Sequence, residues 1–291
     1  MRLRTLAVPT LLLMSALPAH AQQAPPGVLV MTREQFRPGN MAAHNKLMPS
    51  FYALYEKAKV GPYRLGLLPM SGDTNHLLFL ESYSSYADMA GTRMKVGEVI
   101  GATPALQAEM DALQKQNGPM HESQTTWIAL RRADLSYHPK ATMDVAKARV
   151  VSVNVARVNI GRGGDWADYI KQTNAAREKA NLDEHSTVYQ VTSGAPAGTF
   201  LTFVSSPSMA EADALVMGGD ARSKKLNDAL GGEVVVKQRT KTVSEILAQS
   251  TTTWYTVNRG ISRPSPDFVT ADPDFWKAKE AAKEAPKPAK K

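Results

Sequence analysis

Two segments far apart in the chain share one pattern of polar and apolar positions. They read ESQTTWIALRR at residues 122–132 and AQSTTTWYTVNR at residues 248–259. In each, a polar run leads to a Trp and then to an alternating run, which is typical of a strand with one buried face. We expect Trp127 and Trp254 to offer their rings to the core, because large aromatic side chains dominate core packing.

A second pair of similar segments extends the parallel toward the N-terminus. LLFLESYSSYADM at residues 77–89 matches LTFVSSPSMAEAD at residues 201–213. A repeat of such length indicates duplicated domains rather than a solenoid, whose units span about 20–50 residues. The sequence therefore predicts two tandem copies, residues 28–135 and 148–260, joined by a linker at residues 136–147.

The first copy alternates between strand-like and helix-like periodicities. Pro49 lies inside the first helical segment, where we expect a kink or a restart. Ser85 and Thr103 are predicted to cap the later helices. The predicted strands are 28–36, 63–70, 76–81 and 125–130, and the predicted helices are 41–59, one following Ser85 and one following Pro104.

The second copy repeats this order. Ser208 and Glu211 have the spacing of a capping box at the start of its later helical segments, which extend to about residue 249. Each copy thus reads β-α-β-β-α-β, the ferredoxin-like pattern. The predicted strands are 149–160, 186–192, 199–204 and 252–257, with the first helix at residues 166–177.

A sheet of this kind has helices on one face, and its other face must also be covered. With two copies in one chain, the simplest cover for each sheet is the sheet of the other copy. We therefore predict an α+β protein of two tandem ferredoxin-like units, in which neither half folds alone.

The phrases HLLFLESYSSYADM and VYQVTSGAPAGTFLTFVSSPSMAEAD carry a family resemblance over residues 28–258. Their arrangement resembles the dimeric α/β-barrel superfamily, and is most similar to its NIPSNAP and antibiotic-biosynthesis-monooxygenase groups. The resemblance implies that the two units pack as an intramolecular dimeric α/β barrel. Because the superfamily includes cofactor-free oxygenases, haem enzymes, isomerases and ligand-binding proteins, it does not decide the function.

The N-terminus has the features of a secretory signal peptide. Arg2 and Arg4 precede an apolar run, and the small residues of AHA at 19–21 form a cleavage site. We therefore predict a signal peptide at residues 1–21, a mature chain beginning near Gln22, and a periplasmic or secreted location. The remaining sequence has no apolar run long enough to predict a transmembrane segment.

Composition narrows the possible chemistry. The 291 residues are 43% hydrophobic and include no Cys, which excludes disulfides, thiolate nucleophiles and Cys-ligated metals. The formal net charge of +8 lies mainly at the two ends, and residues 277–291 form a Lys/Ala/Pro-rich tail that we expect to be disordered. Because the predicted domains carry little of this charge, we expect no nucleic-acid partner.

The candidate functional residues lie in the first copy. We expect a pocket between its helices and its sheet, where His44 or His76 could act as a general base near neutral pH. Tyr52, Tyr55 and Trp127 are the candidate ligand-binding residues. When the repeats are aligned through residues 77–89 and 201–213, His76 falls on Phe200, so the second copy lacks this histidine.

Other chemistries receive less support. The resemblance implies a proximal haem ligand in the second copy, for which His185 is the candidate, but its place between a helix and a strand does not favour haem. GRGGD at residues 161–165 predicts a tight strand-to-helix turn. Neither a metal-ligand spacing nor a nucleophile motif is present, so we predict no metal site and no cofactor.

These observations favour an exported protein that binds a small apolar or aromatic ligand in a pocket between helices and sheet. An alternative is a cofactor-independent monooxygenase acting on an aromatic or quinone-like compound. A second alternative is a structural envelope protein whose C-terminal tail makes the functional contact. The sequence does not determine the oligomeric state.

Overall fold

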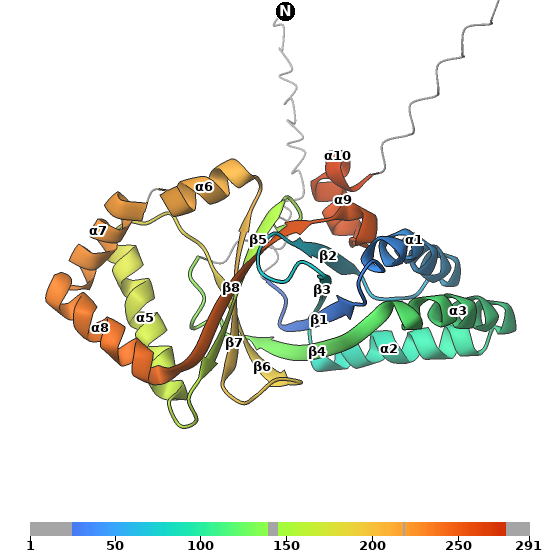
Figure 1. The fold of residues 1–291 in the computed structure, drawn as a ribbon, viewed down its shortest axis with the longest axis horizontal. Helices are drawn as coiled ribbons and strands as arrows, with labels where there is room; N and C mark the ends of the chain where they lie inside the picture. Colours follow the sequence, from blue (N-terminus) through green and yellow to red (C-terminus); the bar gives the residue numbers. More distant parts are fainter. Residues whose placement is uncertain (1–24, 139–144, 218, 278–291) are drawn as a thin grey trace, which may run out of the picture.

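The computed structural model describes residues 25–138, 145–217 and 219–277 (Figure 1). The first unit comprises β1 (Val28–Phe36), α1 (Met41–Ala58), β2 (Arg64–Pro69), β3 (His76–Tyr83), α2 (Tyr86–Gly101), α3 (Pro104–Asn117), the 3-10 helix η1 (Gly118–Met120) and β4 (His121–Arg131). The second comprises β5 (Val150–Val158), α5 (Gly163–Lys179), β6 (Thr187–Ser193), β7 (Thr199–Ser206), α6 (Met209–Met217), α7 (Gly219–Leu230), α8 (Glu233–Ile246) and β8 (Leu247–Val257). The 3-10 helix η2 (Arg259–Ile261), α9 (Pro266–Ala271) and α10 (Pro273–Trp276) follow.

The strands close into a single antiparallel barrel in the order β1-β3-β2-β8-β5-β7-β6-β4. Two seams join the units, one between β2 and β8 and the other between β4 and β6. The predicted α+β fold, with two tandem units in one intramolecular barrel, is confirmed.

Side-chain alternation along the strands separates the barrel interior from the helix-covered outside. On β1, Leu29 and Met31 belong to the large core cluster of the interior, whereas Phe36 packs in a second cluster with residues of α1 and α3. The interior cluster draws residues from both units, including Leu78 of β3 and Leu201 of β7. The barrel core is therefore shared, and each helix layer has a core of its own.

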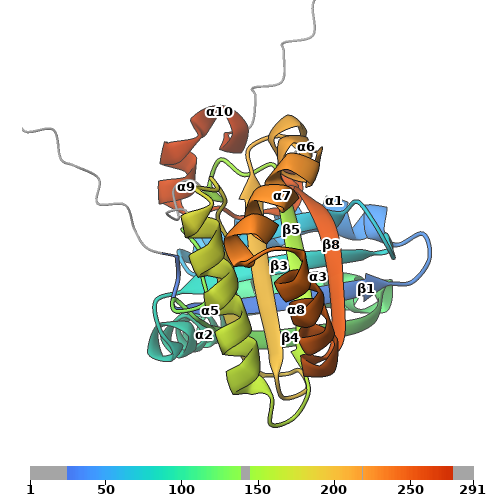
Figure 2. The same cartoon turned by 90° about the vertical axis from the view of Figure 1, so that its left-hand side faces the viewer.

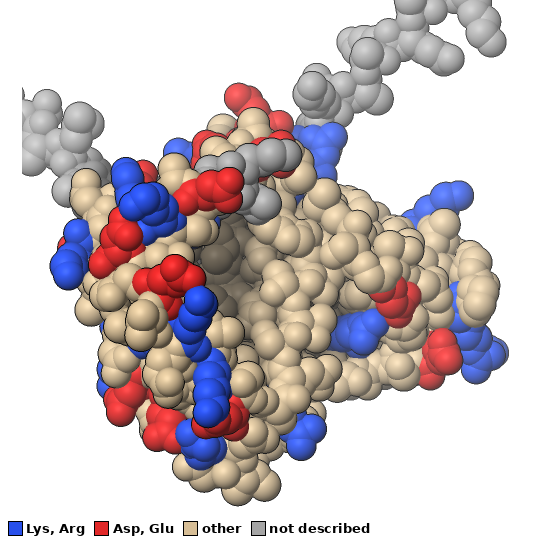
Figure 3. All heavy atoms as spheres, turned by 60° about the vertical axis from the view of Figure 1, so that its left-hand side comes forward, with Lys and Arg blue, Asp and Glu red and all other residues tan. Residues whose placement is uncertain are grey.

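The helices cover the two opposite sides of the barrel, with α1–α3 over the first unit and α5–α8 over the second (Figures 1 and 2). In the second unit this cover is loose, because α7 buries no residue and α8 buries only Ile246. With that unit turned forward, Figure 3 shows a hollow between its charged helices and the uncharged wall of the barrel.

The two matching Trp residues turn out not to be equivalent. β4 and β8 have nearly identical burial patterns. When these patterns are aligned, Trp127 is equivalent to Thr253, and Trp254 is equivalent to Ile128. Trp127 packs against the barrel core, whereas Trp254 neighbours the inward-facing Tyr255 and so points to the opposite face. The prediction that both rings face the core is therefore wrong for Trp254, although the duplication it suggested is present.

Local details of the helices differ from expectation in two places. α1 runs without interruption through Pro49, and Thr103 makes no side-chain capping bond to α3. The predicted caps Ser85 and Ser208 do accept hydrogen bonds, from the backbone N–H groups of Asp88 and Glu211. α9 and α10 were not predicted, and they contribute buried aromatic side chains to the barrel core.

The predicted signal peptide, most of the predicted tail and the middle of the linker lie outside the described residues. Within the described part, no helix combines the length and the apolar character that crossing a membrane requires.

Candidate functional site

One end of the barrel interior contains a cavity of about 650 Å³. This volume lies within the range of about 300–1,000 Å³ that is typical of small-molecule sites. Its walls are mainly apolar and include Leu29, Leu65, Leu80, Val151, Phe203 and Val257.

The two units contribute matching residues to this cavity. On β1 and β3, Leu29 pairs with Ser82, and on β5 and β7, Val151 pairs with Ser205. All four line the cavity, so small hydroxyl side chains stand at equivalent positions of both units. The cavity therefore depends on the closure of the barrel by both halves.

Three of the larger polar side chains around this cavity already have partners within the protein. A ring nitrogen of His185, the residue considered for haem, lies 2.7 Å from the carbonyl oxygen of Ser205. The hydroxyl of Tyr189 donates to the carbonyl of Pro26, and burial raises its pKa. Arg263 pairs with Glu56. Apolar contact is therefore the main interaction that the cavity offers.

A second, smaller pocket of about 270 Å³ lies between the helices and the sheet of the first unit. It is lined by Thr32, Tyr55, Pro62, Arg64, Glu81, Thr92, Arg93, Val96 and Gln124. The guanidinium of Arg64 lies 3.2 Å from Oε1 of Glu81, and the Tyr83 hydroxyl donates a hydrogen bond to Oε2 of the same carboxylate. This pocket occupies the predicted place, but its lining is strongly polar.

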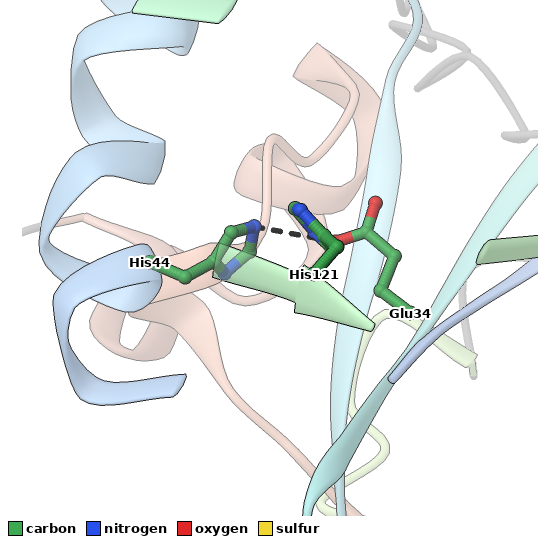
Figure 4. Close-up of side chains that lie close together, drawn as sticks. All are labelled: Glu34, His44 and His121. Carbon is green, nitrogen blue, oxygen red and sulfur yellow. Dashed lines mark hydrogen bonds and ion pairs between the residues drawn. The ribbon is translucent and has the colours of Figure 1, made fainter. Parts of the chain in front are cut away.

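Beside this pocket, three titratable side chains meet on the helix-covered face of the sheet (Figure 4). Glu34 comes from β1, His44 from the first turns of α1, and His121 from the start of β4. The Nε2 atoms of both histidines lie 3.2 Å from the Oε2 atom of Glu34. Glu34 and His44 are buried and His121 is partly buried, so water screens these charges little.

The surroundings hold the two imidazole rings in place. Nδ1 of His121 lies 3.0 Å from the backbone carbonyl oxygen of Asn117, and Nδ1 of His44 lies 3.4 Å from the side-chain oxygen of Asn45. Phe36 packs against both rings. In both histidines, Nε2 is therefore the nitrogen directed toward the carboxylate.

The electrostatics of the cluster favour an ionised Glu34. Burial alone would raise the pKa of this carboxyl, but the neighbouring His121 and His44 outweigh burial and lower it to about 2. The same contact with Glu34 raises the pKa of His121. Both shifts favour an ion pair between the Glu34 carboxylate and a protonated His121.

The predicted site residues fall on two sides of the sheet. His44, Tyr52 and Tyr55 lie on the helix side, where the Tyr52 hydroxyl donates to the carbonyl of Ile261 at 2.6 Å. His76 contacts the hydroxyl of Tyr255, which belongs to the barrel-core cluster, and Trp127 packs against that same cluster. Burial and the charge of Arg33 lower the pKa of His76. No single pocket therefore gathers all five residues.

Glu34 and His121 were not among the sequence candidates. The prediction of no metal site considered only ligands close together in the sequence, whereas the pairing of β1 with β4 brings residues 34 and 121 together. The sequence did contain one local signal for Glu34. Glu34 is an even number of residues from the apolar Val30 and Phe36, so it lies on the same face of β1 as they do. A carboxylate on a buried face requires a partner.

Comparisons with known proteins find solved structures of low similarity. No family model matches the chain, and no curated protein matches its sequence. Similar solved structures include an anthrone oxidase-like protein, with 11% identity and a TM-score of 0.48 over 80% of this chain and 92% of that one. A chlorite dismutase mutant from Candidatus Nitrospira defluvii has 9% identity and a TM-score of 0.45 over 86% and 95%. A heme-binding protein from Thermus thermophilus has 10% identity and a TM-score of 0.41 over 82% and 97%.

At such low identity and similarity, these structures say nothing of the activity of this chain. The more specific resemblance to the NIPSNAP and antibiotic-biosynthesis-monooxygenase groups stays a prediction. The strand order and the two seams are observed directly in the chain itself. They show one closed antiparallel barrel built from two α+β units, with both units supplied by one chain.

Proposed function

We propose that the protein binds a small ligand with an apolar or aromatic body in the cavity at the end of the barrel. The observation that carries this proposal is the cavity of about 650 Å³ with largely apolar walls. Burial of apolar ligand surface contributes about 25 cal/mol per Å², which is the main attraction such walls can offer. The site differs from the predicted one, because the helix-side pocket is smaller and more polar.

A fluorescent aromatic probe, N-phenyl-1-naphthylamine, tests this site. We expect the wild-type protein to bind the probe, and Ser205→Phe to weaken binding about tenfold or more, because the added ring occupies the cavity. Ser82→Phe, at the matching position of the first unit, should act in the same way. The measurement is a fluorescence titration of the full mature chain.

Val204→Phe is the matched control. Val204 lies between two cavity-lining residues of β7, so its side chain points to the other face of the strand. Probe binding should be unchanged in this variant. If Val204→Phe weakens binding and Ser205→Phe does not, the ligand occupies the space between helices and sheet, and the proposed cavity is wrong.

The monooxygenase hypothesis has less structural support. In its predicted form it requires His44 or His76 and Tyr52 or Tyr55 directed at one cavity, but Tyr52 donates its proton to a backbone carbonyl and His44 is directed at Glu34. Tyr55 lines the helix-side pocket, whereas neither His44 nor His76 lines either cavity described above. The envelope-protein hypothesis depends on a tail outside the described residues. Binding without turnover is therefore the function that we propose.

We also propose that the protein is exported, because residues 1–21 have the pattern of a signal peptide. Expression of the full chain in a bacterium should give a periplasmic or secreted protein whose mass corresponds to a start near Gln22. A cytoplasmic protein that retains residues 1–21 would contradict this prediction.

A further inference from the structure

We propose that Glu34, His44 and His121 form a binding site for a divalent first-row transition metal ion. This site is separate from the cavity at the end of the barrel, and the proposal does not depend on the proposed function. It follows from the geometry of the donor atoms, an unpartnered buried nitrogen and a comparison of the two units.

The donor atoms are close to the spacing that one ion requires. Metal bonds to imidazole nitrogen and carboxylate oxygen are about 2.0–2.2 Å long, so neighbouring ligand atoms of one ion lie roughly 3.0–3.6 Å apart. Each Nε2 atom is 3.2 Å from the Oε2 atom of Glu34, and all three donor atoms lie within 4.8 Å of one another. Small side-chain adjustments can therefore bring them onto a single ion.

His44 has a buried nitrogen whose bonding capacity is unused. Its side chain is 1% exposed, and Nε2 has no hydrogen-bond partner, although it lies 3.2 Å from the Oε2 atom of Glu34. A buried polar atom without a partner costs about 1–3 kcal/mol. A metal ion between the two side chains would satisfy this nitrogen.

The contacts of the Nδ1 atoms of both histidines are typical of metal-binding histidines. Histidine ligands commonly donate their second N–H to a carbonyl or a carboxylate, which fixes the tautomer and orients the ring. Nδ1 of His121 lies 3.0 Å from the carbonyl oxygen of Asn117, and Nδ1 of His44 faces the side-chain oxygen of Asn45. Each arrangement directs Nε2 toward Glu34, and a metal ion would take the place of the proton between His121 Nε2 and the carboxylate.

The second unit shows what the fold itself requires at these positions. In each unit the register of the first and last strands shifts by one step, at the pair Phe36–His121 and at the pair Val158–Leu247. These pairs are therefore equivalent. Two residues earlier on the first strand of each unit, Glu34 is equivalent to Ala156. Counting from the first residues of α1 and α5 aligns His44 with Trp166.

The three equivalents Ala156, Trp166 and Leu247 pack together in an apolar cluster. The architecture can therefore be filled with apolar side chains at this place. The polar cluster of the first unit is not needed to complete the fold.

The donor set indicates the class of ion. Two imidazoles and one carboxylate suit Zn²⁺, Fe²⁺ and similar ions, whereas Mg²⁺ and Ca²⁺ prefer oxygen ligands. Three protein ligands leave further coordination positions for water or a ligand. The helix-side pocket begins next to the site, because Thr32 precedes Glu34 on the same face and Gln124 pairs with Glu34 across the strands.

Titration calorimetry of the chelator-treated mature protein tests the proposal. We expect Zn²⁺ to bind with a stoichiometry of one, and Co²⁺ to give the visible absorption of a protein-bound ion. An Fe²⁺ titration without oxygen compares the two candidate ions. Glu34→Gln, His44→Ala and His121→Ala should each weaken binding more than about 100-fold, which exceeds the roughly 10–100-fold effect of losing an outer partner of a ligand.

Two further variants separate metal binding from structural effects. His138→Gln removes an exposed histidine paired with Glu178, and should leave metal binding unchanged. The triple variant Glu34→Ala, His44→Trp, His121→Leu introduces the side chains of the second unit. It should remain folded by circular dichroism and bind no metal.

Two results would overturn the proposal. One is a wild-type protein that binds none of these ions at the expected stoichiometry. The other is metal binding that persists in Glu34→Gln, whose amide has nearly the shape of the carboxylate and therefore leaves the fold intact. In either case the three residues form only a buried ion pair.

Discussion

Leu201→Ala is expected to lower the free energy of unfolding of the whole chain by about 2–5 kcal/mol, in a single transition. Truncation of a fully buried leucine removes its burial energy and leaves a cavity that neighbouring residues fill incompletely. Leu201 is 0% exposed and lies in the barrel core. Because both units contribute to this core, the loss should destabilise the entire barrel rather than the second unit alone.

Leu78→Ala is the matched change in the first unit. The strand pairs match Leu201 with Leu78, one residue away from the alignment predicted from the sequence, because Leu78 pairs with Arg33 as Leu201 pairs with Val155. The side chain of Leu78 is 2% exposed. Urea unfolding followed by circular dichroism and by Trp fluorescence should give coincident curves for both variants, shifted by similar amounts. Val234→Ala, at a position 81% exposed, should change the stability by less than about 0.5 kcal/mol.

Two separate transitions, each moved by only one of the leucine variants, would contradict a shared core. They would mean that the units fold independently and that barrel closure contributes little to stability. The same outcome would contradict the expectation from the sequence that neither half folds alone.

The strands and their order within each unit could be predicted from the sequence, because period-2 alternation is a local property. The predicted strand at residues 28–36 agrees with β1 in its bounds. The face of the sheet on which each side chain lies was harder to predict, since a shift of one residue turns a side chain to the opposite face. Trp127 and Trp254 look equivalent in the sequence, but they differ by that single residue.

The candidate metal ligands illustrate what local patterns omit. His44 was identified because it lies on the first predicted helix, beside the pocket expected between helices and sheet. Glu34 and His121 become its neighbours only through the pairing of β1 with β4 and the docking of α1. Such contacts depend on topology, so the spacing of ligands in the sequence could not reveal them.

The position of the cavity at the barrel end could not be predicted from local sequence patterns either. A pocket was expected between helices and sheet, on the resemblance to a family. The cavity at the barrel end is lined by side chains of both units, including the small Ser82 of β3 and Ser205 of β7. Whether two inner faces fill the space between them depends on both units together.

Gly194→Val is expected to destabilise the protein by about 3 kcal/mol or more, because this residue sets how closely the two units approach. Gly194 follows β6, whose last residue Ser193 pairs with Ile128 of β4 at a seam between the units. Its φ of +90° disfavours a side chain, and a Cβ atom would lie 2.2 Å from the carbonyl oxygen of Thr126. Since that obstacle is backbone, it cannot be relieved by a change of rotamer.

Gly161→Val separates the two causes of this cost. Gly161 has a similar φ of +83°, but a Cβ atom would meet nothing within 4 Å. This control should therefore show only the backbone cost, about 1–2 kcal/mol. Urea unfolding measures both values, and hydrogen exchange should show weakened protection along β4 and β6 in Gly194→Val alone. Equal destabilisation of the two variants, with an intact seam, would show that close packing at Gly194 does not hold the units together.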